Sequence, residues 1–168
     1  MDDLSGLIEA QIAPLRRYAR ALTRDPTAVD DLVQETVARA LSKIRLWQEY
    51  TDMRAWLFTI LHNQYINQFR RLAREGKVVS GGDNALSETR PPNQIDRLEL
   101  RDLDRALAKL PEEQRSVILL IGLEGMPYKK VAKITGIPVG TVRSRASRGR
   151  EELRRLMGKS PDKRAEAA

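Results

Sequence analysis

The sequence contains no cysteine and only one histidine, which narrows the chemistry open to it. Without cysteine, disulfides, thiolate metal sites and thiol nucleophiles are all excluded. One histidine leaves too few imidazoles for a histidine-based metal site or a catalytic dyad. No grouping of nucleophile, base and metal ligands stands out, so an enzyme is the least favoured class. We therefore expect no cofactor and no metal.

Long apolar runs are also missing. The longest, at about 117–123, is far shorter than the roughly 20 residues that cross a bilayer. The N-terminus lacks the basic and then apolar pattern of a signal peptide, so we expect a cytoplasmic protein without membrane insertion. Aromatic residues make up only 5% of the chain. The core must therefore consist mainly of Leu, Ile, Val and Ala, a composition typical of small helical bundles.

Positive charge is present in excess, with a net charge of +7, but it is unevenly distributed. Residues 128–168 include 12 basic and 4 acidic side chains, whereas 1–75 include 11 and 10, and 76–127 include 7 and 9. The excess lies in the last quarter of the chain, where a polyanion would bind. Taken alone, this charge run is equally compatible with a basic, solubilising tail.

The first half of the chain has the periodicity of three helices. The first covers 4–23 and is predicted to break or kink at Pro14, because proline lacks a backbone donor. Asp25 can cap the second helix, whose apolar residues recur every three or four positions. Asp52 can cap the third. These helices predict a small bundle that ends near Arg74.

The pattern fails between 75 and 94, where three glycines and two consecutive prolines indicate a flexible linker. Helical periodicity returns at Ile95, and Pro111 can open a further helix. We predict an all-α fold with two small helical domains joined by this linker. The predicted boundaries are 1–74 for the first domain, 75–94 for the linker, 95–160 for the second domain and 161–168 for a disordered tail.

Residues 128–148 have the pattern of a helix-turn-helix. The segment YKKVAKIT predicts a short helix, and Gly136 suits the tight turn because a positive φ costs glycine little. Pro138 suits the start of the second helix, and Val142 can pack in the angle between the two. The spacings of four residues from Ala132 to Gly136 and of six to Val142 are those of DNA-binding helix-turn-helix motifs.

The second of these helices has a predicted buried side and a predicted DNA side. The buried stripe comprises Val142, Ala146, Gly149, Leu153 and Leu156. The residues left to project outward from the first turns are Thr141, Arg143, Ser144, Ser147 and Arg148. Arginine can bind guanine through two hydrogen bonds, and serine can donate or accept. On the preceding helix, Lys129, Lys130 and Lys133 suit phosphate contacts. A solvated helical hairpin is the alternative.

Three segments together resemble a known family. LPEEQRSVILLIGLEGMPYKKVAKITGIPVGTVRSRASRGREELRRLM resembles region 4 of the extracytoplasmic-function (ECF) group of sigma-70 family factors. DDLVQETVARAL resembles region 2.2, and RAWLFTILHNQYINQFRR resembles regions 2.3 and 2.4. The resemblance implies a factor that binds core RNA polymerase, recognises the −35 element with region 4 and opens the −10 element with region 2.

The resemblance assigns roles to three sets of residues. Arg143, Ser144, Ser147 and Arg148 fall on the −35 face, and Asn63 matches the asparagine that holds the −10 element. Residues on the same helix that suit an exposed base edge or the phosphates of a separated strand are Asn67, Arg70 and Arg71. Trp56 is expected in the core or a groove, and His62 at the surface. The polymerase-binding surface that the resemblance implies comprises Asp31, Gln34, Glu35, Ala38 and Arg39. Without the resemblance, this surface is interpreted as an exposed helix that carries a Glu35–Arg39 ion pair.

The resemblance also leaves alternatives and departures. It implies core RNA polymerase, promoter DNA and an anti-sigma factor as partners, and a stress- or signal-responsive regulon. One alternative is a sigma-like decoy that sequesters an anti-sigma factor without binding promoters, and another is a simple repressor or activator. Met126-Pro127 replaces the serine that often precedes Tyr128, so a side-chain cap is lost. Ser147 stands where a larger aromatic residue or histidine is common, so the −35 preference is expected to differ.

Overall fold

The computed structural model describes residues 2–47, 52–77 and 94–158, and the regular elements within these ranges are all helical. The predicted all-α fold is therefore confirmed. In chain order the elements are α1 (Asp2–Thr23), α2 (Pro26–Ser42), the 3₁₀ turn η1 (Ile44–Leu46), α3 (Met53–Arg74), α4 (Gln94–Lys109), α5 (Glu112–Gly122), α6 (Tyr128–Thr135) and α7 (Val139–Leu156). Most of the predicted linker, 78–93, and the predicted tail, 161–168, lie outside the described residues.

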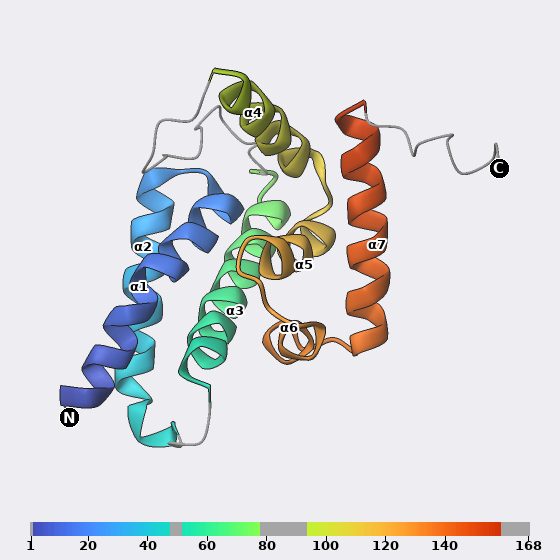
Figure 1. The fold of residues 1–168 in the computed structure, drawn as a ribbon. Coiled ribbons are helices and arrows are strands. Elements are labelled where there is room, and N and C mark those ends of the chain that lie inside the picture. The colour runs from blue at the N-terminus through green and yellow to red at the C-terminus, as the bar shows by residue number, and fades with distance from the viewer. Residues whose placement is uncertain (1, 48–51, 78–93, 159–168) are drawn as a thin grey trace.

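Helices α1, α2 and α3 pack against one another and form the N-terminal region of the fold (Figure 1). Leu32 and Leu61 are fully buried between them. The rings of Tyr18 and Phe58 lie 5.4 Å apart in a tilted arrangement, one of the geometries that aromatic pairs prefer. The predicted caps are present, since Asp25 accepts a hydrogen bond from the Thr27 amide, and Asp52 accepts one from the Ala55 amide.

The predicted break of the first helix is wrong, because α1 continues through Pro14. Proline inside a helix removes one backbone hydrogen bond and crowds the preceding turn, at a cost of about 3 kcal/mol. Leu15 and Tyr18, which follow Pro14, are completely buried against the other helices. Burial of two such side chains stabilises the fold by roughly 3–6 kcal/mol. Tertiary packing therefore outweighs the local preference of proline.

Helices α4 to α7 form the C-terminal region, in which α7 packs against α5 (Figure 1). The inner side of α7 consists of Val142, Ala146 and Gly149. A Cβ atom on Gly149 would lie 2.9 Å from Cγ1 of Ile118, so the absence of a side chain lets the two helices approach. The predicted stripe is thus confirmed over these turns, whereas Leu153 and Leu156 are only half-buried.

The two helices of the predicted helix-turn-helix are α6 and α7. Val131 and Ile134 of α6 are buried, and Gly136 ends this helix with φ 71° and ψ 24°. This left-handed conformation is unfavourable for residues with a Cβ atom. Pro138 precedes α7, and Val142 is fully buried. Neither Pro127 nor Pro138 provides a side-chain cap, so the predicted loss of the cap before Tyr128 is confirmed.

The two regions also pack against each other, with α5 against α1 and α6 against α3 (Figure 1). Most of their buried apolar residues belong to one connected cluster. Arg115 of α5 donates a hydrogen bond of 2.8 Å to the Tyr65 hydroxyl of α3. Arg24, after α1, donates one of 2.8 Å to the Asp104 carbonyl of α4 and pairs with the Asp104 carboxylate. The two predicted helical units are therefore in direct contact.

His62 lies in the core of the N-terminal region, so its predicted surface position is wrong. Only 5% of the residue is exposed, and its Nδ1 atom lies 3.4 Å from the Tyr18 hydroxyl. Burial disfavours the charged imidazolium and lowers the pKa of His62 from 6.5 to about 4. Helical spacing carries the signal for this burial, because His62 lies four residues after buried Phe58 and three before buried Tyr65.

Gly136 lies in the left-handed turn and Gly140 lies in α7, so alanine at these two positions should have opposite effects on stability. Gly136→Ala should lower the free energy of unfolding by about 1 kcal/mol, because alanine is strained at positive φ. Gly140→Ala should leave this free energy unchanged or raise it by up to about 1 kcal/mol, because Gly140 is helical and an added Cβ meets nothing within 4 Å. Urea denaturation followed by circular dichroism measures both. Equal effects of the two substitutions would contradict the assignment of the turn.

Burial of His62 predicts a loss of stability in mild acid. Between pH 6.5 and about 4 the unfolded chain binds a proton at His62 that the folded chain does not, so stability falls as pH falls through this window. The loss between pH 7 and pH 5 should be about 2 kcal/mol, and His62→Gln should remove most of it. Because the chain has one histidine, NMR titration of its imidazole gives the pKa directly. A measured pKa near 6.5 would contradict the burial of the His62 imidazole.

Candidate nucleic-acid interface

The predicted base-contacting side of α7 faces solvent. Arg143, Ser144, Ser147 and Arg148 are exposed, and Thr141 is half-exposed. They follow one another along the first turns of the helix, opposite Val142, Ala146 and Gly149. Arg145 is a contrasting case, since it is directed to α5 and lies 3.7 Å from the Glu113 carboxylate. The structure therefore brings the five predicted residues together on one accessible surface.

Tyr128 supports this surface, a role that the sequence analysis missed. The guanidinium carbon of Arg143 lies 6.0 Å from the centre of the Tyr128 ring, at the outer limit of a cation–π contact. Arg150 donates a hydrogen bond of 3.2 Å to the Tyr128 hydroxyl. The ring thus links the start of α6 to two arginines of α7 that lie two turns apart, and restricts the positions of their side chains.

A shallow groove of about 530 Å³ adjoins the base-contacting side. Thr141, Ser144 and Arg148 line one wall of it, and residues of α5 such as Gln114 line the other. The Ser144 hydroxyl donates a hydrogen bond of 3.1 Å to the Gly140 carbonyl. Its oxygen keeps free acceptor capacity, so in this rotamer Ser144 is suited to a donor on a base or on water.

The three predicted phosphate-binding lysines do not share one environment. Lys129 and Lys133 are exposed, and among the described residues no ion pair involves either of them. Lys130 instead forms an ion pair with Asp52, the residue that caps α3. Two of the three ammonium groups are therefore available to DNA in this arrangement, while the third is directed to the N-terminal region.

The predicted −10 residues lie along one side of α3. Asn63, Asn67, Arg70 and Arg71 are all exposed. The side chains of Asn63, Asn67 and Arg71 are four residues apart, so they follow one another on the helix. Trp56 is half-buried and packs against the apolar core, which agrees with its predicted position in the core or a groove.

The predicted polymerase surface is the outer side of α2. Asp31, Gln34, Glu35, Ala38 and Arg39 are all exposed. The expected pair forms within it, with Arg39 donating two hydrogen bonds of 3.1 and 2.7 Å to one Glu35 oxygen. Such an exposed pair contributes only a few tenths of a kcal/mol. Its contribution to helix stability is therefore small.

The α2 and α3 surfaces meet at one polar groove of about 650 Å³. Glu35 and Arg39 lie on one side of it, and Asn67 and Arg71 lie on the other. Beneath them, Thr36 donates a buried hydrogen bond of 2.9 Å to Gln64, which joins the two helices. The predicted polymerase surface of α2 and the predicted −10 surface of α3 therefore adjoin along this groove.

Two family models match the chain in the order of its two regions. The model described as "Sigma2 domain of PhyR" matches residues 8–62, and the one described as "Sigma-70, region 4" matches residues 100–153. The second match includes all of α6 and α7 up to residue 153. In the part of the chain that the structure describes, no helix is long and apolar enough to cross a membrane.

Named proteins and solved structures resemble the chain over nearly its full length. The ECF RNA polymerase sigma factor EcfG of Rhodopseudomonas palustris is 39% identical over 158 residues, which cover 93% of this chain and 86% of the relative. The sigma factor RpoE of Bartonella quintana, solved in complex with the anti-sigma factor NepR, is 33% identical with a TM-score of 0.78, over 96% of this chain and 100% of that one.

A third similarity concerns the fold alone. The anti-anti-sigma factor PhyR of Bartonella quintana, complexed with NepR, is 17% identical with a TM-score of 0.60, over 90% of this chain and 50% of that one. The identity to EcfG and its extent, together with the region 4 match, determine the family. The chain therefore belongs to the ECF RNA polymerase sigma factors of the sigma-70 family.

Proposed function

We propose that the chain is a sigma factor that binds core RNA polymerase, recognises −35 and −10 promoter elements and initiates transcription of a stress- or signal-responsive regulon. The observation that carries this proposal is the exposed row of arginines and serines on α7, within a helix-turn-helix of this family. A basic charge excess accompanies that row. Electrostatic attraction to phosphates brings the helix to DNA, and base contacts then select the sequence.

Each region has its own task in this proposal. Arg143 and Arg148 recognise −35 base edges, and Lys129, Lys130 and Lys133 bind flanking phosphates. On α3, Asn63 and Asn67 bind exposed bases of the −10 element, while Arg70 and Arg71 hold its backbone. On α2, the exposed surface from Asp31 to Arg39 binds the polymerase. The groove shared by α2 and α3 supports this division, because residues assigned to the −10 element and residues assigned to polymerase line it together.

The functional boundaries follow the helices. We assign 1–74 to polymerase and −10 binding, 75–94 to the linker, 95–160 to −35 binding and 161–168 to a tail. The end of α3 at Arg74 and the start of α4 at Gln94 support the two inner boundaries. The protein acts in the cytoplasm, where polymerase and promoter DNA are found. An anti-sigma factor is the expected regulator, because RpoE of Bartonella quintana was solved with one.

A decoy that captures an anti-sigma factor is the second candidate. The match of residues 8–62 to the sigma2 domain of PhyR favours it. A decoy has no use for base-contacting side chains, however, and Arg143, Arg148 and Asn63 are present and exposed. Promoter-specific transcription separates the two candidates, because only a sigma factor supports it.

Replacing either Arg143 or Arg148 of α7 should sharply reduce specific transcription without loss of polymerase binding. Loss of one bidentate guanine contact costs about 1–3 kcal/mol of discrimination, so Arg143→Ala and Arg148→Ala should each reduce run-off transcription from the cognate promoter about tenfold or more. Arg154→Ala is the matched control, since Arg154 is exposed on α7 beyond the base-contacting turns. Unchanged transcription from both variants would disprove the assigned surface.

The exposed lysines should act through charge and without sequence preference. Lys133→Ala should weaken binding to cognate and unrelated duplexes by a similar factor, because a phosphate contact carries no base information. It should also lower the slope of log affinity against log salt by about 1. Fluorescence anisotropy over a salt series measures both quantities. A change confined to the cognate duplex would instead place Lys133 at a base edge.

A further inference from the structure

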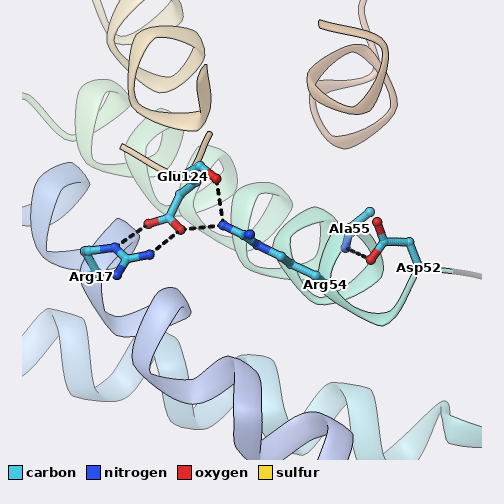
Figure 2. Close-up of polar contacts among 5 residues, drawn as sticks. All are labelled: Arg17, Asp52, Arg54, Ala55 and Glu124. Atoms are coloured by element: carbon cyan, nitrogen blue, oxygen red, sulfur yellow. Dashed lines mark hydrogen bonds and ion pairs between the residues drawn. The ribbon is translucent and has the colours of Figure 1, made fainter. Parts of the chain in front are cut away.

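Glu124 joins the two regions through a fully buried carboxylate. It lies between α5 and α6, and its side chain has no exposed surface. Arg17 of α1 donates hydrogen bonds of 2.9 and 2.8 Å to its two carboxylate oxygens. Arg54 of α3 donates one of 2.7 Å to the carboxylate and one of 2.8 Å to the Glu124 carbonyl. Figure 2 shows the carboxylate between the two guanidinium groups.

The Glu124 carboxylate can remain buried only while both regions are in contact. A carboxylate without partners is costly to remove from water. The partners of Glu124 are arginines of the N-terminal region, and their side chains are 49% and 34% exposed. When the regions separate, all three charges become hydrated. The closed arrangement therefore has a specific charge contact that the open one lacks.

A second ion pair crosses the same boundary and involves a predicted DNA contact. Lys130 of α6 pairs with Asp52 at the start of α3. The Asp52 carboxylate thus accepts the hydrogen bond from the Ala55 amide that caps α3 and also pairs with Lys130. Hydrogen bonding to Lys130 lowers the pKa of Asp52 and opposes the effect of its partial burial. This pair offsets part of the Lys130 charge and directs its ammonium toward Asp52, which weakens its attraction to a phosphate.

The closed arrangement is too small to reach both promoter elements. A compact chain of 168 residues has a radius of gyration of about 15 Å. The −35 and −10 elements, about 25 base pairs apart, are separated by roughly 85 Å of duplex at 3.4 Å per pair. The segment from Lys77 to Gln94 can span at most about 60 Å. Separation of the regions is therefore necessary for promoter binding, and the connecting segment supplies up to about 60 Å of the distance while the width of the two regions covers the remainder.

We infer that Glu124, held by Arg17 and Arg54, is a latch that keeps the free factor closed and must open before the two regions engage a promoter. The need for opening rests on the proposed function, whereas the existence of the latch rests on the contacts alone. The prediction is that removal of the Glu124 charge shifts the free protein toward separated regions.

Distance measurements on the free full-length protein test the latch. The chain has no cysteine, so Ala10→Cys on α1 and Glu151→Cys on α7 introduce two exposed labelling sites, one in each region. Single-molecule energy transfer between dyes at these positions reports the closed and open populations. Neither polymerase nor promoter is present, so a negative result here is distinguishable from failure of the proposed function.

Three variants define the outcome. Glu124→Gln keeps the shape but removes the charge, and Arg17→Ala removes one guanidinium; each should raise the ratio of open to closed molecules about tenfold, since charge-assisted hydrogen bonds are lost. Glu152→Gln is the control, because it removes an ion pair that lies within α7. Circular dichroism checks that the helices persist.

The latch would be overturned by either of two results. One is a wild-type protein that is already open in solution. The other is an unchanged distance distribution in Glu124→Gln and Arg17→Ala with full helicity. If Glu124→Gln loses helicity, Arg17→Ala decides, because the Arg17 side chain is half-exposed and contributes little to the core.

Discussion

The burial of one carboxylate constrains how the two regions of the chain meet. Glu124 cannot leave water without cationic partners, and those partners, Arg17 and Arg54, lie on two helices of the other region. Satisfying it fixes the end of α5 against α1 and the start of α3. The packing of α6 on α3 and the Lys130–Asp52 pair follow from the same approach. The apolar cluster common to both regions then becomes continuous.

The packing of the two regions leaves some of the predicted binding surfaces exposed and engages one of the predicted DNA contacts. The predicted base-contacting residues of α7 and the exposed sides of α2 and α3 remain open to solvent. Lys130, in contrast, is occupied by Asp52. The closed molecule can thus present either recognition surface singly, while its size prevents simultaneous contact with −35 and −10 elements. The proposed latch would control the factor through the distance between its regions, more than through access to any one side chain.

The features predicted correctly from the sequence are those that depend on residues close together in the chain. The helix ends at Asp25 and Asp52, the turn at Gly136 and the exposed row from Thr141 to Arg148 all follow from caps, backbone preference and helical period. Contacts between distant segments were not predictable in this way. Arg17 and Glu124 are 107 positions apart, and nothing near Glu124 indicates that its carboxylate is buried. Pro14 was misjudged for the same reason, because tertiary packing decides that α1 continues through it.

Reconstituted transcription with core RNA polymerase, followed by genome-wide mapping of start sites, tests the central claim most directly. A sigma factor should direct polymerase to a set of starts, each preceded by the same two short elements at a fixed spacing. These starts should be absent with core polymerase alone. If the protein bound an anti-sigma factor but added no specific starts, the account given for α3 and α7 would be contradicted, and the decoy would be the correct interpretation.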